Sequence, residues 1–172
     1  MTRKIQGLKW ARRAAPPGFA KGPGPKVGAK AQGLGYERAV ARELPQALKG
    51  LWWEFEDGNG LGWCQTDFFI PGKSEGLVLE CKLGYSEGAW KQLELLYLPV
   101  VQLATGLKIQ GLQVTKLLRG PGFAPVGAGV RVGAKPPGIR VVNRLESGLA
   151  LARLGHRVVV HWTGLGPILE RN

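Results

Sequence analysis

Apolar spacing and capping residues mark three helical segments of this chain. Tyr36, Val40 and Leu44 recur at intervals of four residues, which is the spacing of one helix face. Ser86 and Asn143 can each cap a further helix, because their side-chain oxygens accept backbone N–H groups at a helix start. The predicted helices cover residues 36–44, 86–97 and 144–154.

Five segments carry the β-branched, aromatic or alternating apolar residues that strands favour. The Asp-Gly-Asn-Gly sequence at 57–60 predicts a tight turn, since Asp-Gly and Asn-Gly pairs favour positive φ. Residues 71–75 predict a short connection that folds two strands into a hairpin. The predicted strands cover 51–56, 63–70, 76–83, 107–117 and 157–162. This order of helices and strands predicts an α/β fold.

Two stretches are rich in glycine, proline and basic residues, at a density that prevents long helices. Residues 1–35 predict a basic arm with room for a short helix over 5–13. Residues 120–138 predict a long basic loop, and loops of this length are usually functional or mobile. The predicted organisation is therefore an arm over 1–35 and a single domain over 36–172, with a catalytic core over 36–118, the loop over 120–138 and a C-terminal helix and strand over 143–163.

The composition limits the class of protein. The chain has 172 residues, of which 44% are hydrophobic, and this suits one globular domain with its own core. It contains no uncharged apolar run of about 18 residues, and no apolar stretch of signal-peptide length follows Met1. We therefore expect no membrane span and a cytoplasmic location. Two cysteines are too few for a disulfide framework or a structural zinc site, so Cys64 and Cys81 are expected in the core.

Charge is distributed unevenly along the chain, whose 24 basic and 12 acidic residues give a net charge of +12. Residues 1–36 carry eight basic and no acidic residues, 37–94 carry six basic and ten acidic, and 95–172 carry ten basic and two acidic. Basic flanks attract a polyanion such as nucleic acid, whereas an acidic centre repels phosphate unless a cation lies there. The distribution indicates metal-dependent chemistry on nucleic acid. The alternative is a basic protein that binds nucleic acid or ribosomes without catalysis.

The residues with the clearest chemistry lie on the second and third predicted strands. Glu80 and Lys82 are two positions apart on one strand, so both point to the same face. If 71–75 closes a hairpin in which the numbers of opposed residues sum to 147, Asp67 lies opposite Glu80 and Gln65 lies opposite Lys82. Two carboxylates and an ammonium group then converge. The alternative is that Glu80 and Lys82 form an exposed salt bridge.

Carboxylate oxygens suit Mg²⁺, for which Mn²⁺ can substitute, and such ions keep waters and bind substrate phosphates. A metal held by Asp67 and Glu80 would lower the pKa of an attacking water. Lys82 would orient or deprotonate that water, or neutralise the phosphate.

These residues resemble the signature of the PD-(D/E)xK nuclease superfamily, which has an Asp at a strand end followed by Glu-x-Lys on the next strand. Asp67 and Glu80-Cys81-Lys82 match it, and Glu37 stands where the family often carries a glutamate on the preceding helix. The resemblance implies a restriction-endonuclease-like mixed central β-sheet flanked by helices. It also implies that Glu37, Asp67, Glu80 and Lys82 are catalytic and that the three acids bind the metal.

Over residues 33–100 the pattern is most similar to the archaeal-type Holliday junction resolvases, which are compact, basic homodimers. Thr66 replaces the usual proline before the aspartate, and 51–66 lacks the serine that those resolvases tend to carry. Some exonuclease-like branches use a Gln and a Tyr on the helix after the strands. Gln92, with Tyr97 behind it, is therefore an accessory candidate together with Gln65, and the alternative for Gln92 is a solvated helix face.

The expected function is a metal-dependent endonuclease that cleaves four-way DNA junctions by paired phosphodiester hydrolysis as a homodimer. The alternatives are an exonuclease or another DNA endonuclease of the superfamily, and a non-catalytic basic nucleic-acid-binding protein. Trp52 and Trp53 point to opposite strand faces, so one is expected in the core and the other against DNA or a second copy. Basic candidates for binding the DNA backbone lie on both flanks: Arg12, Arg13, Lys21, Lys26, Lys30, Arg131, Lys135 and Arg140.

Overall fold

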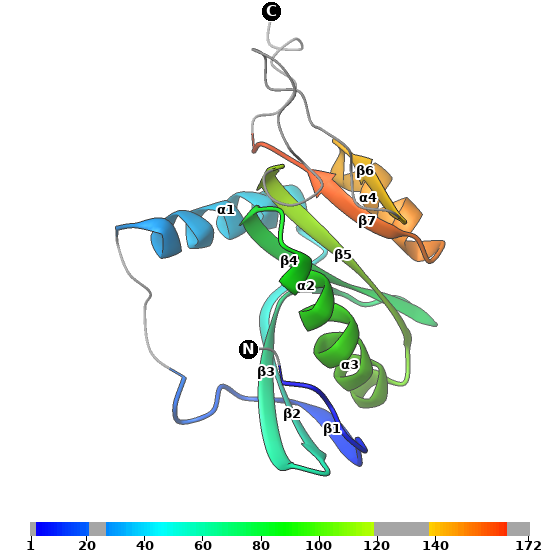
Figure 1. Cartoon of the computed structure of the whole chain (residues 1–172). Coiled ribbons are helices and arrows are strands. Elements are labelled where there is room, and N and C mark those ends of the chain that lie inside the picture. The colour runs from blue at the N-terminus through cyan, green and yellow to red at the C-terminus, as the bar shows by residue number, and fades with distance from the viewer. Residues whose placement is uncertain (1–2, 21–26, 119–137, 165–172) are drawn as a thin grey trace, which may run out of the picture.

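The computed structural model describes residues 3–20, 27–118 and 138–164 (Figure 1). These residues form a seven-stranded mixed sheet in the order β1-β2-β3-β4-β5-β7-β6. The pairs β1–β2, β2–β3 and β3–β4 are antiparallel. The pairs β4–β5, β5–β7 and β7–β6 are parallel. The strands are β1 (Trp10–Ala14), β2 (Leu48–Asp57), β3 (Gly60–Ile70), β4 (Glu75–Gly84), β5 (Lys108–Leu117), β6 (Ile139–Val142) and β7 (Arg157–His161).

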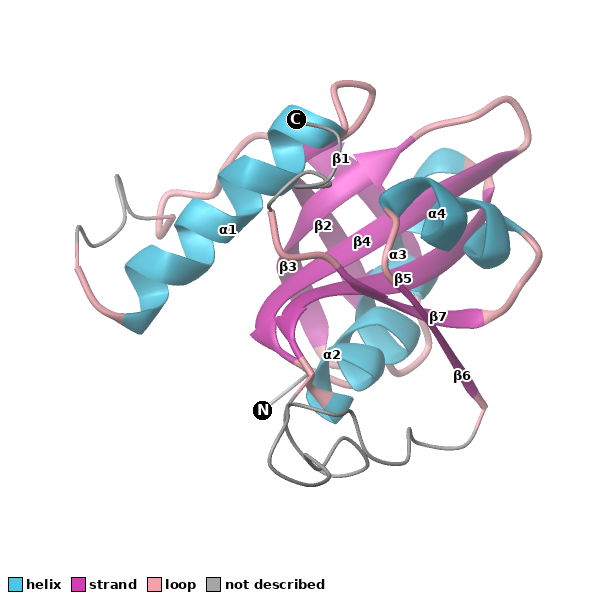
Figure 2. Ribbon diagram, turned by 90° about the horizontal axis from the view of Figure 1, so that it is seen from above, coloured by secondary structure: helices cyan, strands magenta, loops and turns pink. Residues whose placement is uncertain are grey.

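Helices cover both faces of the sheet (Figure 2). Helices α1 and α4 pack on one face, mainly against β4 and β7, and α2 and α3 lie on the other with a π-helical turn, η1, between them. The helices are α1 (Ala29–Glu43), α2 (Glu87–Gln92), η1 (Leu93–Tyr97), α3 (Leu98–Thr105) and α4 (Leu145–Arg153). The protein is therefore a mixed α/β fold, as the order of predicted elements indicated.

Each face of the sheet has its own hydrophobic core. In β7, Val158 and Val160 point to the core under α1 and α4, and Val159 points to the core under α3. A parallel strand buried on both faces needs apolar residues at every position, which explains this continuous valine run. The α3-side core includes Trp53, Phe55, Trp90 and Val100, and the α1-side core includes Tyr36, Val40, Leu79 and Leu149. Cys64 and Cys81 are both buried and free, as expected.

The N-terminal segment departs from the prediction. The short helix predicted over 5–13 is wrong, because Trp10–Ala14 forms edge strand β1 and pairs with β2. The buried carboxylate of Asp57 accepts hydrogen bonds from Arg3 Nη2 at 2.6 Å and from the backbone of Gln6 and Asn59. Burial would raise the pKa of Asp57, but these hydrogen bonds outweigh burial and hold it below its usual value. Part of the predicted arm is thus tied to the β2–β3 turn.

The helix boundaries also differ. Helix α1 begins at Ala29, before the apolar spacing that predicted it, and ends at Glu43 before Pro45. Helix α4 begins at Leu145, and its flanking residue is Arg144, which makes no side-chain cap, so the predicted Asn143 cap is wrong. The described residues contain no helix long and apolar enough to cross a membrane. The predicted loop over 120–138 lies, except for Gly138, outside the described residues.

Candidate functional site

The predicted acids lie where β3 separates from β4. The two strands pair only over 68–70 and 77–79, in the predicted register in which opposed residues sum to 147. The next pair would be Asp67 with Glu80, but β3 bends away there and continues along β2. The register prediction is confirmed, and the acids face a fork between the two strands.

A local break in the β2–β3 ladder positions Asp67. Gly50 stands opposite Asp67 with a φ of 68°, a left-handed conformation that glycine adopts at little steric cost. Cys64 belongs to the α3-side core and Phe68 to the α1-side core, although regular alternation would place both on one face. The faces of β3 therefore exchange at Asp67. Its carboxylate turns toward β4 and accepts a 2.8 Å hydrogen bond from the backbone N–H of Cys81.

Glu80 is buried beside a partly exposed lysine. The side chain of Glu80 is 4% exposed, and its Oε1 lies 3.0 Å from Nζ of Lys82, whose side chain is 35% exposed. The second carboxylate oxygen, Oε2, is buried and has no hydrogen-bond partner within the described parts of the chain. A buried carboxylate oxygen without a donor is costly, so this atom is free to accept a proton or bind a cation.

The two strand acids affect each other strongly. Burial, and then the neighbouring Asp67, raise the pKa of Glu80 to about 8, although Lys82 opposes both. Burial also raises the pKa of Asp67, although Cys81 N–H and Lys82 favour its charged form. For Lys82, burial lowers the pKa, but Glu80 and Asp67 outweigh burial and raise it. The pair of acids therefore retains a proton near neutral pH when no cation lies between them.

Glu37 reaches the same region from α1. It is half-buried, and burial followed by the charge of Asp67 raises its pKa to about 7, against the influence of Lys49, Lys82 and Arg38. Within residues 3–20, 27–118 and 138–164, no group of three or more His, Cys, Asp or Glu side chains is arranged to hold a metal ion. Glu37 thus lies within electrostatic reach of Asp67 without completing a three-ligand cluster.

The residues present nevertheless fit Mg²⁺. This ion keeps several waters and usually binds through one or two carboxylates plus substrate phosphate, so Asp67 and Glu80 suffice as protein ligands. The unpartnered Oε2 of Glu80 is a hard oxygen ligand that the protein leaves available. Burial and the charge of Asp67 raise the pKa of Glu80, and the same two causes favour a bound cation as well as a bound proton.

Gln92 and Tyr97 lie beside these acids. Gln92 Nε2 donates a 2.6 Å hydrogen bond to Tyr97 Oη. They are five residues apart, which brings them to the same side because η1 has π-helical i→i+5 geometry. Burial and then the charges of Glu80 and Asp67 raise the pKa of Tyr97. The sequence pattern indicated Tyr97 only as a neighbour of Gln92.

Gln65 is not placed opposite Lys82. The β3–β4 pairing ends at Phe68, and Gln65 instead pairs with Trp52 of β2. Its Nε2 donates to the carbonyl oxygen of Gly50 at 3.1 Å. The prediction that Gln65 opposes Lys82 is therefore wrong, because it assumed that β3 and β4 stay paired beyond Asp67.

A buried glutamine on β5 also supports the site and was missed. Gln113 pairs with Glu80 in the sheet, and its side chain is fully buried. Its Oε1 accepts from Ser86 N and its Nε2 donates to Ser86 O, both at 2.9 Å. Ser86 Oγ in turn accepts from Ala89 N and caps α2, so Gln113 fixes the helix that carries Gln92. The signal available in the sequence was an amide between two apolar residues, Leu112 and Val114, of a predicted strand.

The structure describes four of the eight predicted DNA-binding residues, and these four fall into two groups. Arg13, Lys30 and Arg140 are exposed, whereas Arg12 forms hydrogen bonds of 2.9 and 2.7 Å with Glu54. Arg12 is therefore neutralised by a carboxylate in this structure. The other candidates, Lys21, Lys26, Arg131 and Lys135, lie outside the described residues.

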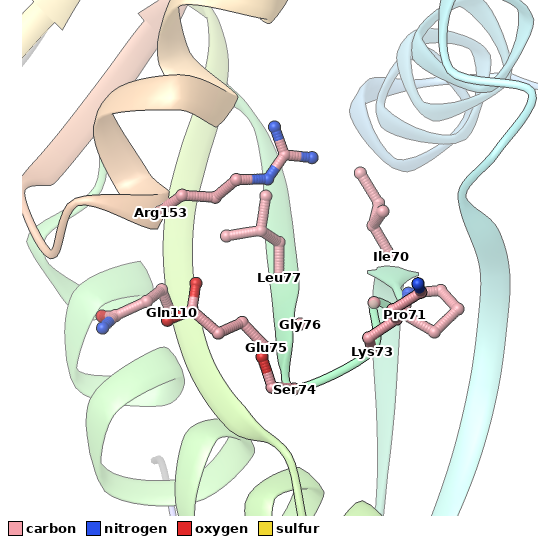
Figure 3. Close-up of a pocket in the computed structure, with 10 residues that line it drawn as sticks. Ile70, Pro71, Lys73, Ser74, Glu75, Gly76, Leu77, Gln110 and Arg153 are labelled. Carbon is pink, nitrogen blue, oxygen red and sulfur yellow. The ribbon is translucent and has the colours of Figure 1, made fainter.

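Two hollows lie outside the acidic fork. The first, of about 210 Å³, is beside the β3–β4 turn, where Arg153 extends from α4 toward Ile70 (Figure 3). The second, of about 560 Å³, lies between α1 and the C-terminal ends of β4 and β5. Neither is lined by Asp67 or Glu80, so the carboxylates themselves, not these hollows, define the candidate site.

Comparison of the chain with protein-family models, with curated proteins and with solved structures finds no match. The functional class of this protein therefore has to be inferred from the acidic fork and the residues around it.

Proposed function

We propose that this protein is a Mg²⁺-dependent nuclease of the PD-(D/E)xK type that cleaves four-way DNA junctions as a homodimer. The observation that carries the proposal is the fork at which Asp67 and Glu80 converge with Lys82. The mixed sheet with helices on both faces is compatible with the architecture that the resemblance implied. The net charge of +12 suits a polyanionic substrate.

Asp67 and Glu80 hold the cation in this proposal. Cys81 N–H orients the Asp67 carboxylate, and Glu80 presents its unpartnered Oε2. When bound, Mg²⁺ lowers the pKa of a coordinated water and offsets charge that develops on the phosphate. Glu37 is the third acid of the proposal, and the charge of Asp67 contributes to its raised pKa.

Lys82 supplies positive charge at the edge of the fork. Its ammonium group is held by Glu80 at 3.0 Å and remains partly exposed, so it can donate to a water or to a phosphate oxygen. The amide and hydroxyl of Gln92 and Tyr97 line the α3 side of the same acids. Donors around a phosphate that gains charge stabilise the transition state.

The junction and the homodimer are the finer parts of the proposal. Two sites related by a two-fold axis suit paired nicks on a symmetric junction. Exposed basic residues, among them Lys30 and Arg140, are available for the DNA backbone and favour recognition of shape over sequence.

The acids are tested by Asp67→Asn and Glu80→Gln, assayed for junction cleavage in Mg²⁺. We expect each variant to lose more than about 100-fold in cleavage rate, since even residues behind metal ligands cost 10- to 100-fold. Junction binding should persist. Glu75→Gln, at the exposed start of the same strand, is the matched control and should cleave normally. Full cleavage by either acid variant would exclude this site.

A second candidate function is an exonuclease of the same superfamily, which the Gln92–Tyr97 hydrogen bond beside the acids favours. A panel of labelled junction, duplex, flap and single-stranded DNA in Mg²⁺, with EDTA as control, separates the candidates. Symmetric nicking of the junction supports the first proposal, and end-dependent degradation supports the second. Salt-sensitive binding without divalent-dependent cleavage of any substrate would identify a non-catalytic nucleic-acid-binding protein.

A further inference from the structure

Three aromatic side chains gather on the outer side of the β2–β3 hairpin, and we call them the aromatic face: Phe19, Trp52 and Trp63. Phe19 meets both indoles edge-on, with ring centroids 6.1 Å from Trp52 and 5.7 Å from Trp63. Phe19 is 62% exposed and Trp63 is 37% exposed. Large aromatic rings seldom gather in solvent without an interaction to serve.

The described helices leave this face open. Helix α3 packs against β1 and β2 from the opposite side, where Trp53 and Phe55 enter its core. Helix α1 packs on β4, and β1 to β3 extend well beyond it (Figure 1). The aromatic face is therefore the outer surface of a hairpin whose inner surface is already buried.

The aromatic face lies on the same strand as Asp67. Trp63 and Gln65 occupy alternate positions of β3, and Trp52 stands directly opposite Gln65. The faces of β3 exchange at Asp67, so the fork and the rings share the strand but not one regular face. Four residues of strand from Trp63 to Asp67 span about 13 Å. About four stacked nucleotides of one DNA strand cover that distance. The rings and Asp67 are therefore separated along β3 by a distance that a few nucleotides of one strand can span.

The charges around the rings are compatible with a polyanionic partner. Glu54 is neutralised by Arg12 at 2.7 Å, and Glu56 is paired with Lys9 at 3.9 Å and with the indole N–H of Trp10. These acids thus have compensating partners. A chain with a net charge of +12 attracts nucleic acid at long range.

We infer that the aromatic face stacks unpaired nucleobases of the substrate strand, a few nucleotides from the bond that is cut. Aromatic rings are a general means of holding single-stranded nucleic acid, because every base has a π-face on which a ring can stack. The inference rests on the proposed function for the position of the cut. It adds that the preferred substrate contains unpaired nucleotides next to the scissile phosphate.

The test measures binding in EDTA, so that cleavage does not contribute. Fluorescence anisotropy compares a labelled duplex that has a four-nucleotide single-stranded gap with the same duplex fully paired. We expect Phe19→Leu and Trp63→Leu each to weaken binding of the gapped DNA about ten-fold, with under about two-fold change for the paired duplex. Phe19→Leu keeps an apolar side chain at an exposed position and removes only the aromatic ring.

Leu154→Ala, a 76% exposed apolar residue after α4, is the control and should bind both DNAs like the wild type. Unchanged binding of gapped DNA by both ring variants, or equal losses on the two DNAs, would overturn the inference. So would sedimentation showing that either variant converts a dimer into monomers, because a second copy would then cover the face. If the wild type binds gapped DNA through these rings but never cleaves it in Mg²⁺, the proposed function fails while the stacking site stands.

Discussion

The acidic fork and the aromatic face share strand β3, but the carboxylates in the two regions differ in how fully they are paired. Next to the aromatic face, Glu54 Oε2 accepts two hydrogen bonds from Arg12, one from Nε at 2.9 Å and one from Nη2 at 2.7 Å. At the fork, Glu80 is more deeply buried and has one lysine contact, and one of its oxygens is left over. Glu54 is thus paired with an arginine next to the aromatic face, whereas Glu80 at the fork has one carboxylate oxygen without a hydrogen-bond partner among the described residues.

This difference separates acids that maintain the fold from acids available for chemistry. Paired, partly exposed charges contribute little to stability in either direction. A buried carboxylate short of partners instead raises the free energy of the cation-free state, and its perturbed pKa is typical of functional sites. The contrast predicts that equivalent substitutions in the two regions have different consequences.

The largest contrast is expected in cleavage rate. Lys82→Met should lower junction cleavage by about 10²- to 10³-fold, because it removes a charged donor next to the reacting phosphate. Lys9→Met, the matched change beside Glu56, should stay within about two-fold of the wild type. Single-turnover rates measure both. Similar losses in the two variants would mean that overall charge, not the fork, controls cleavage.

The next contrast is the pH dependence of stability in EDTA. The pKa of Glu80 is about 8 in the folded protein and about 4.3 in an unfolded chain, so folding favours its protonated form. The resulting stabilisation is complete below about pH 4 and is lost as the pH rises through about 8, a change on the order of 5 kcal/mol. Urea unfolding between pH 4 and pH 9 measures this slope.

Glu80→Gln should reduce that slope, whereas Glu54→Gln at the aromatic face should retain it. Mg²⁺ should also flatten the slope in the wild type, since a bound cation stabilises the ionised carboxylates. A slope that survives Glu80→Gln unchanged would assign it to other groups.

A smaller effect on cleavage rate is expected for Tyr97, which is hydrogen-bonded to Gln92. Tyr97→Phe removes the hydroxyl that accepts from Gln92 and should slow cleavage about ten-fold, with little loss of stability, because the ring still fills the core. The diagnostic measurement is the apparent affinity for Mg²⁺, which a purely structural role would not change. Tyr85→Phe, another buried tyrosine on the same side of the sheet, tests whether any hydroxyl loss has this effect.

The smallest effect, on stability, is expected for the Arg12–Glu54 ion pair next to the aromatic face. A double-mutant cycle on Arg12 and Glu54 should give a coupling energy of about 0 to 1 kcal/mol, because Arg12 is 68% exposed and solvent screens the pair. Urea denaturation of the two single variants and the double variant supplies the cycle. A coupling several times larger would show that this pair holds β1 on the sheet.

The parts of the fold that could be predicted from the sequence depend on local patterns. The register of β3 and β4 followed from the short connection at 71–75 and from apolar alternation on both sides of it. Because that register is local, it placed Asp67 beside Glu80 correctly. Strand β1 could not be found in this way, since Trp10 pairs with Glu56 far along the chain and its own segment has no strand pattern.

The surroundings of the acids depended on backbone irregularities that a sequence pattern does not reveal. The exchange of faces opposite Gly50 took Gln65 away from Lys82, although a glycine in a strand is a general sign of a bulge or bend. The π-helical turn brought Tyr97 round to Gln92, which regular helical spacing would not do. Both irregularities occur at the fork, where function favours departures from regular geometry.

The attachment of the N-terminal segment to the β2–β3 turn has a consequence for synthesis. Arg3 and β1 precede Asp57 in the chain, so they leave the ribosome before their binding partners exist. At about 5–20 residues per second, Trp10 and Arg12 wait roughly 2–9 s before β2 has been made. During that interval the segment is an unpaired basic, aromatic strand, and the growing hairpin lacks its outer edge. Docking of β1 therefore completes this edge of the sheet only after the hairpin behind it has emerged.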